Sequence, residues 1–189
     1  MKARFYKIIG AAVILSSMMI TACVKDLDTI PLDDDVVTSA KIYSEYSNYE
    51  KVLAKVYAGL AVSGQKGPDG NNDLSGLDEG FGQYTRAYFY AQELPTDECL
   101  IGWNDGNLRD YQEMDWSASN EFIFNMYSRI FYQISLANEF IRETSPGKLS
   151  GRGFSDTQVS TIELYRAEAR LLRALSYYHA LDMFGSVPF

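Results

Sequence analysis

The feature that most constrains this fold is a helical spacing of apolar residues that recurs in long stretches of the sequence. Residues three and four positions apart lie on one face of a helix, so this spacing collects apolar side chains into one stripe. The first stretch begins near Ser39 and the second follows Asn120. The third runs from about Asp156 to Phe184. No segment of any length shows the alternation that marks a strand. The sequence therefore predicts an all-α fold with long irregular loops.

The same spacing predicts which side chains form the core. In the first helix they are Ile42, Tyr46, Tyr49, Leu53, Val56 and Leu60. In the second they are Ile123, Tyr127, Ile130, Ile134, Ala137 and Ile141. In the third they are Leu164, Ala167, Leu171, Ala174, Leu175, Tyr178 and Leu181. Asn120 is the expected N-cap of the second helix, and Ser155 with Gln158 forms the expected capping box of the third. Gly64 and Gly185 are the expected stops of the first and third helices.

The second and third helices are expected to pair. A linker rich in Pro and Gly, residues 146–153, separates them, and a connection this short favours antiparallel neighbours. Small and aromatic residues recur on both helices at helical spacing, as in tetratricopeptide units. We therefore expect tetratricopeptide-like helix hairpins.

A glycine-rich segment, residues 64–82, separates the first helix from an aromatic segment and is expected to be a long loop. Its alternate polar positions resemble the first ligands of an EF-hand calcium loop. These positions are Asp69, Asn71, Asp73 and Ser75. However, Leu74 occupies the position that requires Gly, and Gly80 the position that requires a bidentate Glu. A solvated acidic loop is therefore favoured over a calcium site.

The first 22 residues differ in kind from the rest of the chain. Lys2, Arg4 and Lys7 form a basic head, and residues 8–20 form an apolar stretch too short for a comfortable membrane span. This pattern predicts a secretory signal peptide over residues 1–22. The segment ends in Ile-Thr-Ala before Cys23, which resembles the bacterial lipobox. We therefore expect Cys23 to be lipidated, with an ordinary signal peptide as the alternative.

The predicted lipid anchor sets the organisation of the rest of the chain. Buried acyl chains hold a protein on a membrane, at about 0.8 kcal/mol for each CH₂ group. Residues 23–38 are then an acidic tether, and residues 39–189 a helical domain. The start of the tether resembles the surface-export signal of lipoproteins in Bacteroidota-type bacteria. Cys99 has no intramolecular disulfide partner once Cys23 is lipidated, so we expect it to be a small core residue.

Composition excludes several function classes. The net charge is −8, whereas a nucleic-acid reader needs clustered Lys and Arg. The chain has one His and two Cys, which argues against a His/Cys zinc site and a His-based catalytic triad. The single histidine, His179, is expected to be a satisfied core or rim residue. No metal or cofactor is expected.

The end of the third helix carries the most specific motif. Residues 165–174 read Tyr-Arg-Ala-Glu-Ala-Arg-Leu-Leu-Arg-Ala, and residues 183–189 read Met-Phe-Gly-Ser-Val-Pro-Phe. This run resembles the signature of the SusD/RagB family of outer-membrane nutrient-uptake lipoproteins. Three further motifs fit the same family in the same order: the lipobox, residues 27–32, and Leu-Pro-Thr-Asp-Glu at 94–98 followed by Trp-Asn-Asp at 103–105.

This resemblance implies a function. It predicts a surface-exposed lipoprotein of the cell outer membrane, facing the exterior, that binds glycans or other nutrient polymers. It also predicts delivery of the ligand to a SusC-like TonB-dependent transporter, without catalysis. Members of the family continue beyond the Phe-Gly-x-Val-Pro turn, so the chain is expected to be an N-terminal portion with an incomplete site. The alternative is a lipid-anchored helical-repeat scaffold for protein–protein interaction in the cell envelope.

The resemblance also directs attention to one loop as the ligand site. A sugar ring stacks its apolar face on an indole, while its hydroxyls need amide, carboxylate or guanidinium partners. Trp103, Asn104 and Asp105 have this composition, with Asn107 nearby and Arg86 preceding them on the aromatic segment. The alternative for Trp103 is packing of the loop against the core.

Other residues of this region and of the last helix are given structural interpretations. Trp116 is expected to lie in the core. Glu93, Asp97 and Glu98 could be read as the carboxylates of a glycoside hydrolase, but sequence spacing cannot place two carboxylates across a sugar, and the family is not catalytic. The arginines of the last helix are expected to form intrahelical pairs with Glu163 and Glu168, with a transporter contact surface as the alternative. They are Arg166, Arg170 and Arg173.

Overall fold

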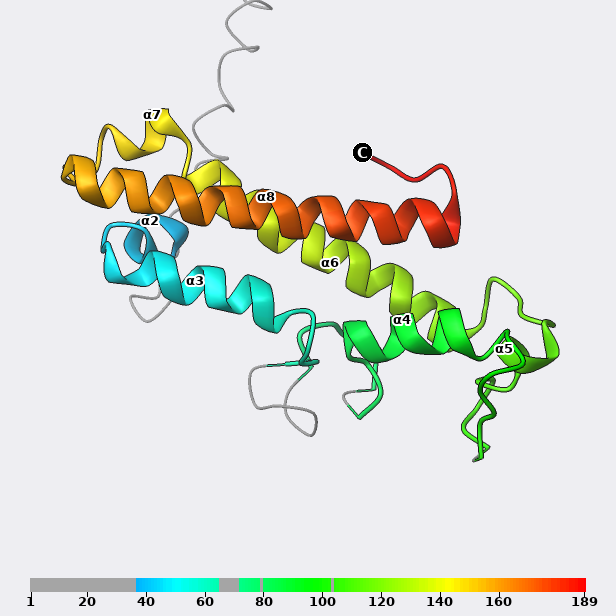
Figure 1. Ribbon diagram of the computed structural model, residues 1–189. Helices are drawn as coiled ribbons and strands as arrows, with labels where there is room; N and C mark the ends of the chain where they lie inside the picture. The colour runs from blue at the N-terminus through cyan, green and yellow to red at the C-terminus, as the bar shows by residue number, and fades with distance from the viewer. Residues whose placement is uncertain (1–36, 65–71, 79, 103) are drawn as a thin grey trace, which may run out of the picture. The chain divides into compact units, whose positions relative to one another are not determined.

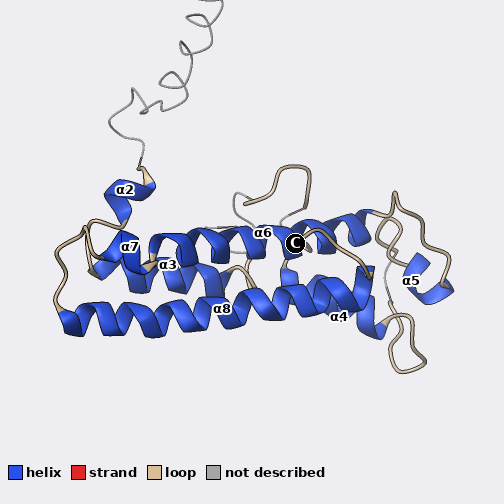
Figure 2. Cartoon of the chain, turned by 90° about the horizontal axis from the view of Figure 1, so that it is seen from above, coloured by secondary structure: helices blue, strands red, loops and turns tan. Residues whose placement is uncertain are grey.

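The computed structural model describes residues 37–64, 72–78, 80–102 and 104–189, which form helices joined by loops (Figures 1 and 2). The helices are α2 (Ser39–Ile42), α3 (Ser47–Ala58), α4 (Tyr84–Glu93), α5 (Asp110–Glu113), α6 (Glu121–Glu143), α7 (Pro146–Leu149) and α8 (Asp156–Phe184). In these ranges strand-type pairing is confined to one isolated bridge, between Gly64 and Asn72. The predicted all-α fold class is confirmed. The predicted signal peptide, the lipidation site Cys23 and most of the tether lie outside the described residues.

Residues 40–189 form one compact unit, in which α6 is the central element. Helix α8 packs along α6, and α3 and α4 pack against different parts of α6 (Figure 1). None of the described helices combines the length and hydropathy that a membrane crossing requires.

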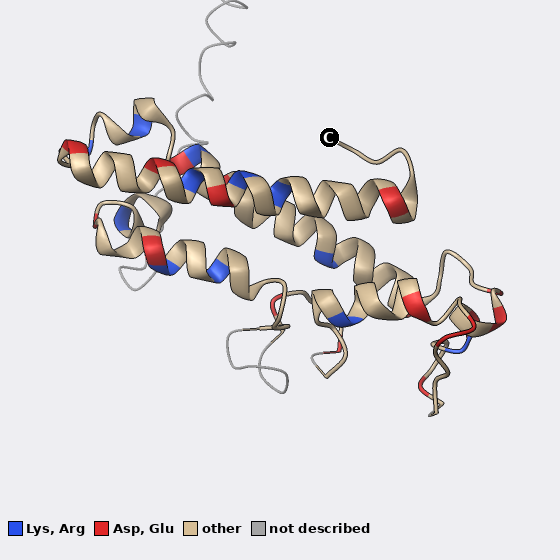
Figure 3. Ribbon diagram, viewed as in Figure 1, with Lys and Arg blue, Asp and Glu red and all other residues tan. Residues whose placement is uncertain are grey.

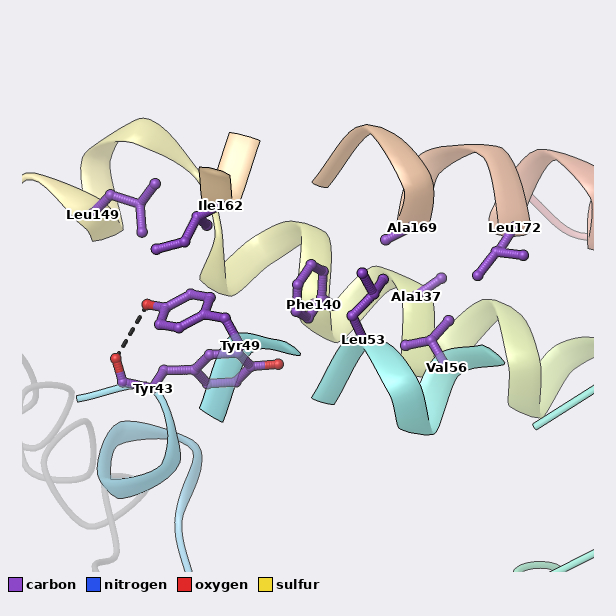
Figure 4. Packing of buried hydrophobic residues seen from close by; sticks show 10 residues of the cluster. All are labelled: Tyr43, Tyr49, Leu53, Val56, Ala137, Phe140, Leu149, Ile162, Ala169 and Leu172. Atoms are coloured by element: carbon purple, nitrogen blue, oxygen red, sulfur yellow. Dashed lines mark hydrogen bonds between the residues drawn. The ribbon is translucent and has the colours of Figure 1, made fainter. Parts of the chain in front are cut away.

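Buried side chains form separate clusters along α6. The first joins α3, the second half of α6 and the first half of α8, and Figure 4 shows it. Its members are Tyr43, Tyr49, Leu53, Val56, Ala137, Phe140, Leu149, Ile162, Ala169 and Leu172. The second cluster joins α4, the middle of α6 and Ala180 of α8. The third, considered below, lies at the beginning of α6. Much of each helix's stability comes from burying such a face.

Local capping signals set the beginnings of the two long helices. The side-chain oxygen of Asn120 accepts hydrogen bonds from the backbone N–H groups of Phe122 and Ile123. Ser155 and Gln158 form a reciprocal capping box at the start of α8. Both caps, and the range of α8, agree with the prediction.

The first predicted helix is divided, which corrects the sequence interpretation. A turn at residues 43–46 separates α2 from α3, and α3 ends at Ala58 rather than near Gly64. Side chains take over backbone bonds at this turn: Asn48 Nδ2 donates to the Ile42 carbonyl at 2.9 Å, and the Tyr49 hydroxyl donates to the Tyr43 carbonyl at 3.1 Å (Figure 4). Such side-chain bonds compete with helix continuation. The stripe itself is confirmed at its centre, where Tyr49, Leu53 and Val56 are buried.

The predicted core face of α8 is wrong. Its leucines and its tyrosine are exposed: Leu164 by 68%, Leu171 by 67%, Leu175 by 38%, Tyr178 by 61% and Leu181 by 60%. The buried residues are Ile162, Ala169, Leu172, Ser176, His179 and Ala180. This helix is apolar on two faces, and the face with smaller residues packs against α6, because small side chains permit close approach.

The second stripe and the charges of α8 also differ in part from the prediction. Ile130, Ile134 and Ala137 of α6 are buried as predicted, but Tyr127 is 38% exposed. Acidic and basic residues both occur along α8 (Figure 3). Their resolved partners lie on other helices: Arg173 donates to Asn138 of α6 at 2.8 Å, and Glu168 accepts from Tyr57 of α3 at 2.7 Å. The expected intrahelical pairs are absent from the ion pairs of residues 156–184.

Candidate functional site

The loop that carries the predicted ligand residues is held by a cluster at the beginning of α6. Its buried members are Tyr90 of α4, Leu94 directly after α4, Leu108, Tyr111 of α5 and Phe122 of α6. Aromatic contacts connect its members: the rings of Tyr90 and Phe122 lie 6.2 Å apart, edge to face. Burial of such rings anchors a segment that has little regular structure of its own. The half-buried thiol of Cys99 is free and packs against the same cluster, in agreement with its expected packing role.

Asn107 is a structural anchor of this loop. Its carbonyl accepts a hydrogen bond from Asn120 Nδ2 at 2.8 Å, and its Oδ1 accepts from the backbone N–H of Glu121 at 3.3 Å. Asn120 is fully buried and also donates to Asp110 Oδ2 at 3.0 Å. Asn120 therefore caps α6 and also holds Asn107 and Asp110, which lie on either side of Leu108, by hydrogen bonds. The side chain of Asn107 is half-buried and engaged with the helix terminus.

Replacing Asn120 by alanine is expected to lower the free energy of unfolding by about 2 kcal/mol. A lost N-cap costs about 1 kcal/mol, and the carbonyl of Asn107 and the carboxylate of Asp110 lose a donor. Urea unfolding followed by circular dichroism measures the change. Ser119→Ala, which removes an exposed hydroxyl next to the cap, is the control and should shift stability by less than about 0.5 kcal/mol. Equal effects of the two variants would contradict the anchoring role of Asn120.

Asn104 and Asp105 are exposed on the same loop, while Trp103 lies outside the described residues. The Asp105 carbonyl accepts from the backbone N–H of Leu108 at 3.0 Å, which closes a turn. Gly106 in this turn has a φ of 48°, a conformation that L side chains rarely adopt. The turn leaves the side chains of Asn104 and Asp105 available to solvent, as a ligand site requires.

Arg86 is engaged within its own segment. Its Nε donates to the hydroxyl of Tyr90 at 2.6 Å, and a terminal nitrogen donates to the carbonyl of Gly80 at 2.7 Å. Its guanidinium also lies over the Tyr90 ring, 5.4 Å from the centroid. Because Tyr90 belongs to the cluster that holds Leu108, Arg86 is connected to the loop through that ring. Its hydrogen bonds do not reach the side chains of Asn104, Asp105 or Asn107.

The calcium interpretation of the glycine-rich loop receives no support from the described positions. Asp69 and Asn71 lie outside the described residues, and Asp73 is paired with Lys55 at 2.8 Å. Ser75 is exposed. Across the described ranges, no three His, Cys, Asp or Glu side chains gather as metal ligands would.

His179 is a packed histidine, as the sequence predicted. It lies in α8 with 9% of its surface exposed, and its Nδ1 is 2.8 Å from the hydroxyl of Tyr84. Its ring stacks on that of Tyr88 with 4.1 Å between centroids. Burial lowers the pKa of His179 below its ordinary value, and the nearby carboxylate of Asp182 opposes this shift. The ring is therefore neutral at pH 7 and serves packing.

Two of the carboxylates considered for hydrolysis follow α4 in the sequence. Asp97 and Glu98 are exposed in the turn after α4, where the hydroxyl of Thr96 donates to the Glu93 carbonyl and accepts from the backbone N–H of Glu98.

The expectation that Trp116 is a core residue is wrong, since the side chain is 47% exposed. Its position after α5 could not be inferred from periodicity, because residues 114–119 are irregular.

Comparison with known proteins gives one informative similarity. No protein-family model matches the chain. The chain is 36% identical, over 192 aligned residues, to the starch-binding protein SusD of Bacteroides thetaiotaomicron. The alignment covers 100% of this chain and 32% of the relative. The chain therefore spans about a third of the length of the curated relative that it matches, and the similarity extends over all of the motifs described above.

Proposed function

The chain is a SusD-like family member, similar to the N-terminal portion of that relative, and on this premise we propose that it captures glycans for nutrient uptake. In this proposal the protein binds its ligand and does not cleave it. The observation that carries the proposal is the 36% identity along the whole chain. Because the relative is a starch-binding protein, starch-like glycans are the first ligand class to test.

The proposed ligand loop is residues 103–107, with Arg86 as a second contact. Exposed Asn104 and Asp105 supply amide and carboxylate groups for sugar hydroxyls, and Trp103 supplies the stacking face. Asn107 contributes by holding the loop to the start of α6. Arg86 keeps its position through Tyr90 and Gly80, so its guanidinium has a fixed orientation.

The proposed setting is the outer membrane, facing the cell exterior. Cys23 would carry the lipid, and the acidic tether would connect it to the helical domain. The ligand would pass to a SusC-like TonB-dependent transporter, with this protein as the capturing subunit. These points rest on the lipobox-like residues and on the similarity to SusD.

Replacing Trp103 by alanine in the full-length protein is expected to weaken glycan binding about 30-fold. Truncating an aromatic side chain at the centre of an interface costs about 2 kcal/mol or more, which corresponds to that factor. Calorimetric titration with maltoheptaose measures the dissociation constant. Phe89→Ala is the matched control, since it removes another exposed aromatic ring, 50% exposed on α4, outside the proposed loop. Unchanged affinity of a folded Trp103 variant would overturn the site assignment.

The scaffold function remains a second candidate because of the exposed apolar face of α8. A groove of about 630 Å³ lies on this face, lined by Leu171, Ala174, Tyr178 and Leu181 together with Arg170 and Arg173. Contiguous apolar surface of this kind is typical of interaction sites. Extraction of the tagged full-length protein in mild detergent distinguishes the two functions. A TonB-dependent barrel at near equal amount supports the uptake pair, whereas smaller envelope proteins without a barrel support the scaffold.

A further inference from the structure

A pocket separate from the proposed ligand loop lies between α4, the segment after α5 and the end of α8. Its volume is about 450 Å³, within the range of about 300–1,000 Å³ that is usual for small-molecule sites. The elements that form it are labelled in Figure 1. None of Arg86, Asn104, Asp105 or Asn107 lines it. All of its lining residues belong to the compact unit 40–189.

An indole forms an open face of this pocket. Trp116 is 47% exposed, and the ring of Tyr111 supports it from the core with 6.1 Å between centroids. Two residues before Trp116, Met114 forms the C-cap of α5 with a left-handed φ of 51°, and its backbone N–H donates to the Asp110 carbonyl. A left-handed residue other than Gly costs of the order of one kcal/mol, and such strain concentrates at functional sites.

Polar groups that can form hydrogen bonds with the hydroxyls of a ligand line the same pocket. Gln92 Nε2 of α4 donates to Asp182 Oδ2 of α8 at 2.9 Å. This bond uses neither the amide oxygen of Gln92 nor the second carboxylate oxygen of Asp182, and both are hydrogen-bond acceptors for a ligand. The hydroxyl of Tyr111, a residue 4% exposed, also lacks a partner there. Burial raises the pKa of Tyr111 to about 12, so its hydroxyl keeps its proton at pH 7.

The charge of the pocket restricts the ligand class. Asp182 is the only charged residue among those that line it, and no Lys or Arg lines it. A carboxylate without a cationic counterpart disfavours anionic ligands such as phosphates. A ligand that suits this pocket therefore has one apolar face, which stacks on the indole. It also has several hydroxyls, which donate to the oxygens of Gln92 and Asp182. A neutral pyranose ring has both features.

We propose that the Trp116 pocket is a second sugar subsite, which binds one neutral pyranose ring of a glycan. The proposal deepens the function proposed above and rests on it. In the subsite, the ring stacks on the indole and its hydroxyls donate to Gln92 and Asp182. A glycan that spans both places would gain affinity from the two contacts together.

Fluorine NMR of the full-length protein labelled with 5-fluorotryptophan tests the subsite directly. The resonance of Trp116 is identified by its loss in Trp116→Phe, and that of Trp103 by its loss in Trp103→Phe. The probes are maltoheptaose, xylohexaose and mannohexaose, with tetramethylammonium chloride as a cationic probe. We expect a saturable shift of the Trp116 resonance with at least one of the three glycans. No shift of that resonance with any glycan, or a shift with tetramethylammonium alone, overturns the proposal.

Failure of the subsite and failure of the proposed function give different results. If the Trp103 resonance shifts and that of Trp116 does not, the glycan-binding function stands and the second subsite is refuted. If neither resonance shifts, both fail. Trp116→Ala should weaken binding of the glycan about tenfold by calorimetry, while Phe89→Ala should leave it unchanged. Equal affinities of Trp116→Ala and the wild type, with equal melting temperatures, would likewise refute the subsite.

Discussion

Replacing Arg152 by alanine is expected to lower the free energy of unfolding by about 3–5 kcal/mol, the range typical of a broken buried ion pair. Arg152 follows α7 and faces Glu143, which is only 3% exposed at the end of α6. Its guanidinium donates to the Glu143 carboxylate, to the Glu143 carbonyl at 2.6 Å and to the hydroxyl of Tyr49 at 2.5 Å. It also lies over the rings of Tyr43 and Tyr49. One side chain thus joins α3, α6 and the linker before α8.

The large cost arises because the alanine variant leaves a buried carboxylate behind. Arg142 and Lys148 lie 3.3 and 3.5 Å from Glu143, but their side chains are 62% and 54% exposed and compensate weakly. Urea unfolding measures the loss. Arg142→Ala is the matched control, with an expected change below about 1 kcal/mol, because its pairs are largely solvated. If the two variants lost similar stability, the buried pair would not be the stabilising feature.

Replacing Arg129 by alanine is expected to cost about 3 kcal/mol. Arg129 lies on α6 with 1% of its surface exposed, and one of its terminal nitrogens donates to the Ser63 carbonyl at 3.0 Å and to Asn72 Oδ1 at 2.7 Å. It therefore holds the start of the glycine-rich loop, at Ser63, and its middle, at Asn72, against the central helix. Burial lowers the pKa of Arg129, while Asp73 opposes the shift. Alanine leaves the two acceptors without this donor and opens a cavity.

A second substitution at this position distinguishes the stability lost with side-chain volume from the stability lost with the hydrogen bonds. Arg129→Met fills most of the space and removes a buried charge whose Nε and other terminal nitrogen have no partner in the described part of the chain. We expect it to cost less, about 1–2 kcal/mol. Urea unfolding measures both variants, and hydrogen exchange should show reduced protection near Ser63 and Asp73 in each. Arg109→Ala, at an exposed arginine, should change neither quantity. Full stability of Arg129→Ala would show that the loop is held by other contacts.

Local signals were sufficient to predict where the two long helices begin and where α8 ends. The caps at Asn120 and Ser155 and the range of α8 follow from residues within one turn of each helix end, because capping is a short-range interaction. The division of the first helix was missed because its stripe continues through the turn. There, the side chains of Asn48 and Tyr49 satisfy carbonyls that a continuous helix would have bonded itself.

The composition of the ligand loop could also be read from the sequence, but not the environment of each residue. Sequence placed an amide, a carboxylate and an indole at residues 103–105. It could not show that Asn107 is engaged with the start of α6, or that Arg86 is engaged with Tyr90 and Gly80. Those contacts join residues on different elements, and their geometry depends on how the elements pack.

The sequence by itself determined the all-α class, the caps of the two long helices and the family motifs, since each depends on neighbouring residues. Only the tertiary structure decided which faces are buried. Helix α8 carries two apolar faces, and periodicity favours the one with larger side chains. The smaller residues Ala169, Ser176 and Ala180 pack against α6 instead, and leave Leu171 and Leu181 exposed. The same packing leaves Trp116 half in solvent beside a pocket, because burial is a property of the assembled elements rather than of one residue's apolarity.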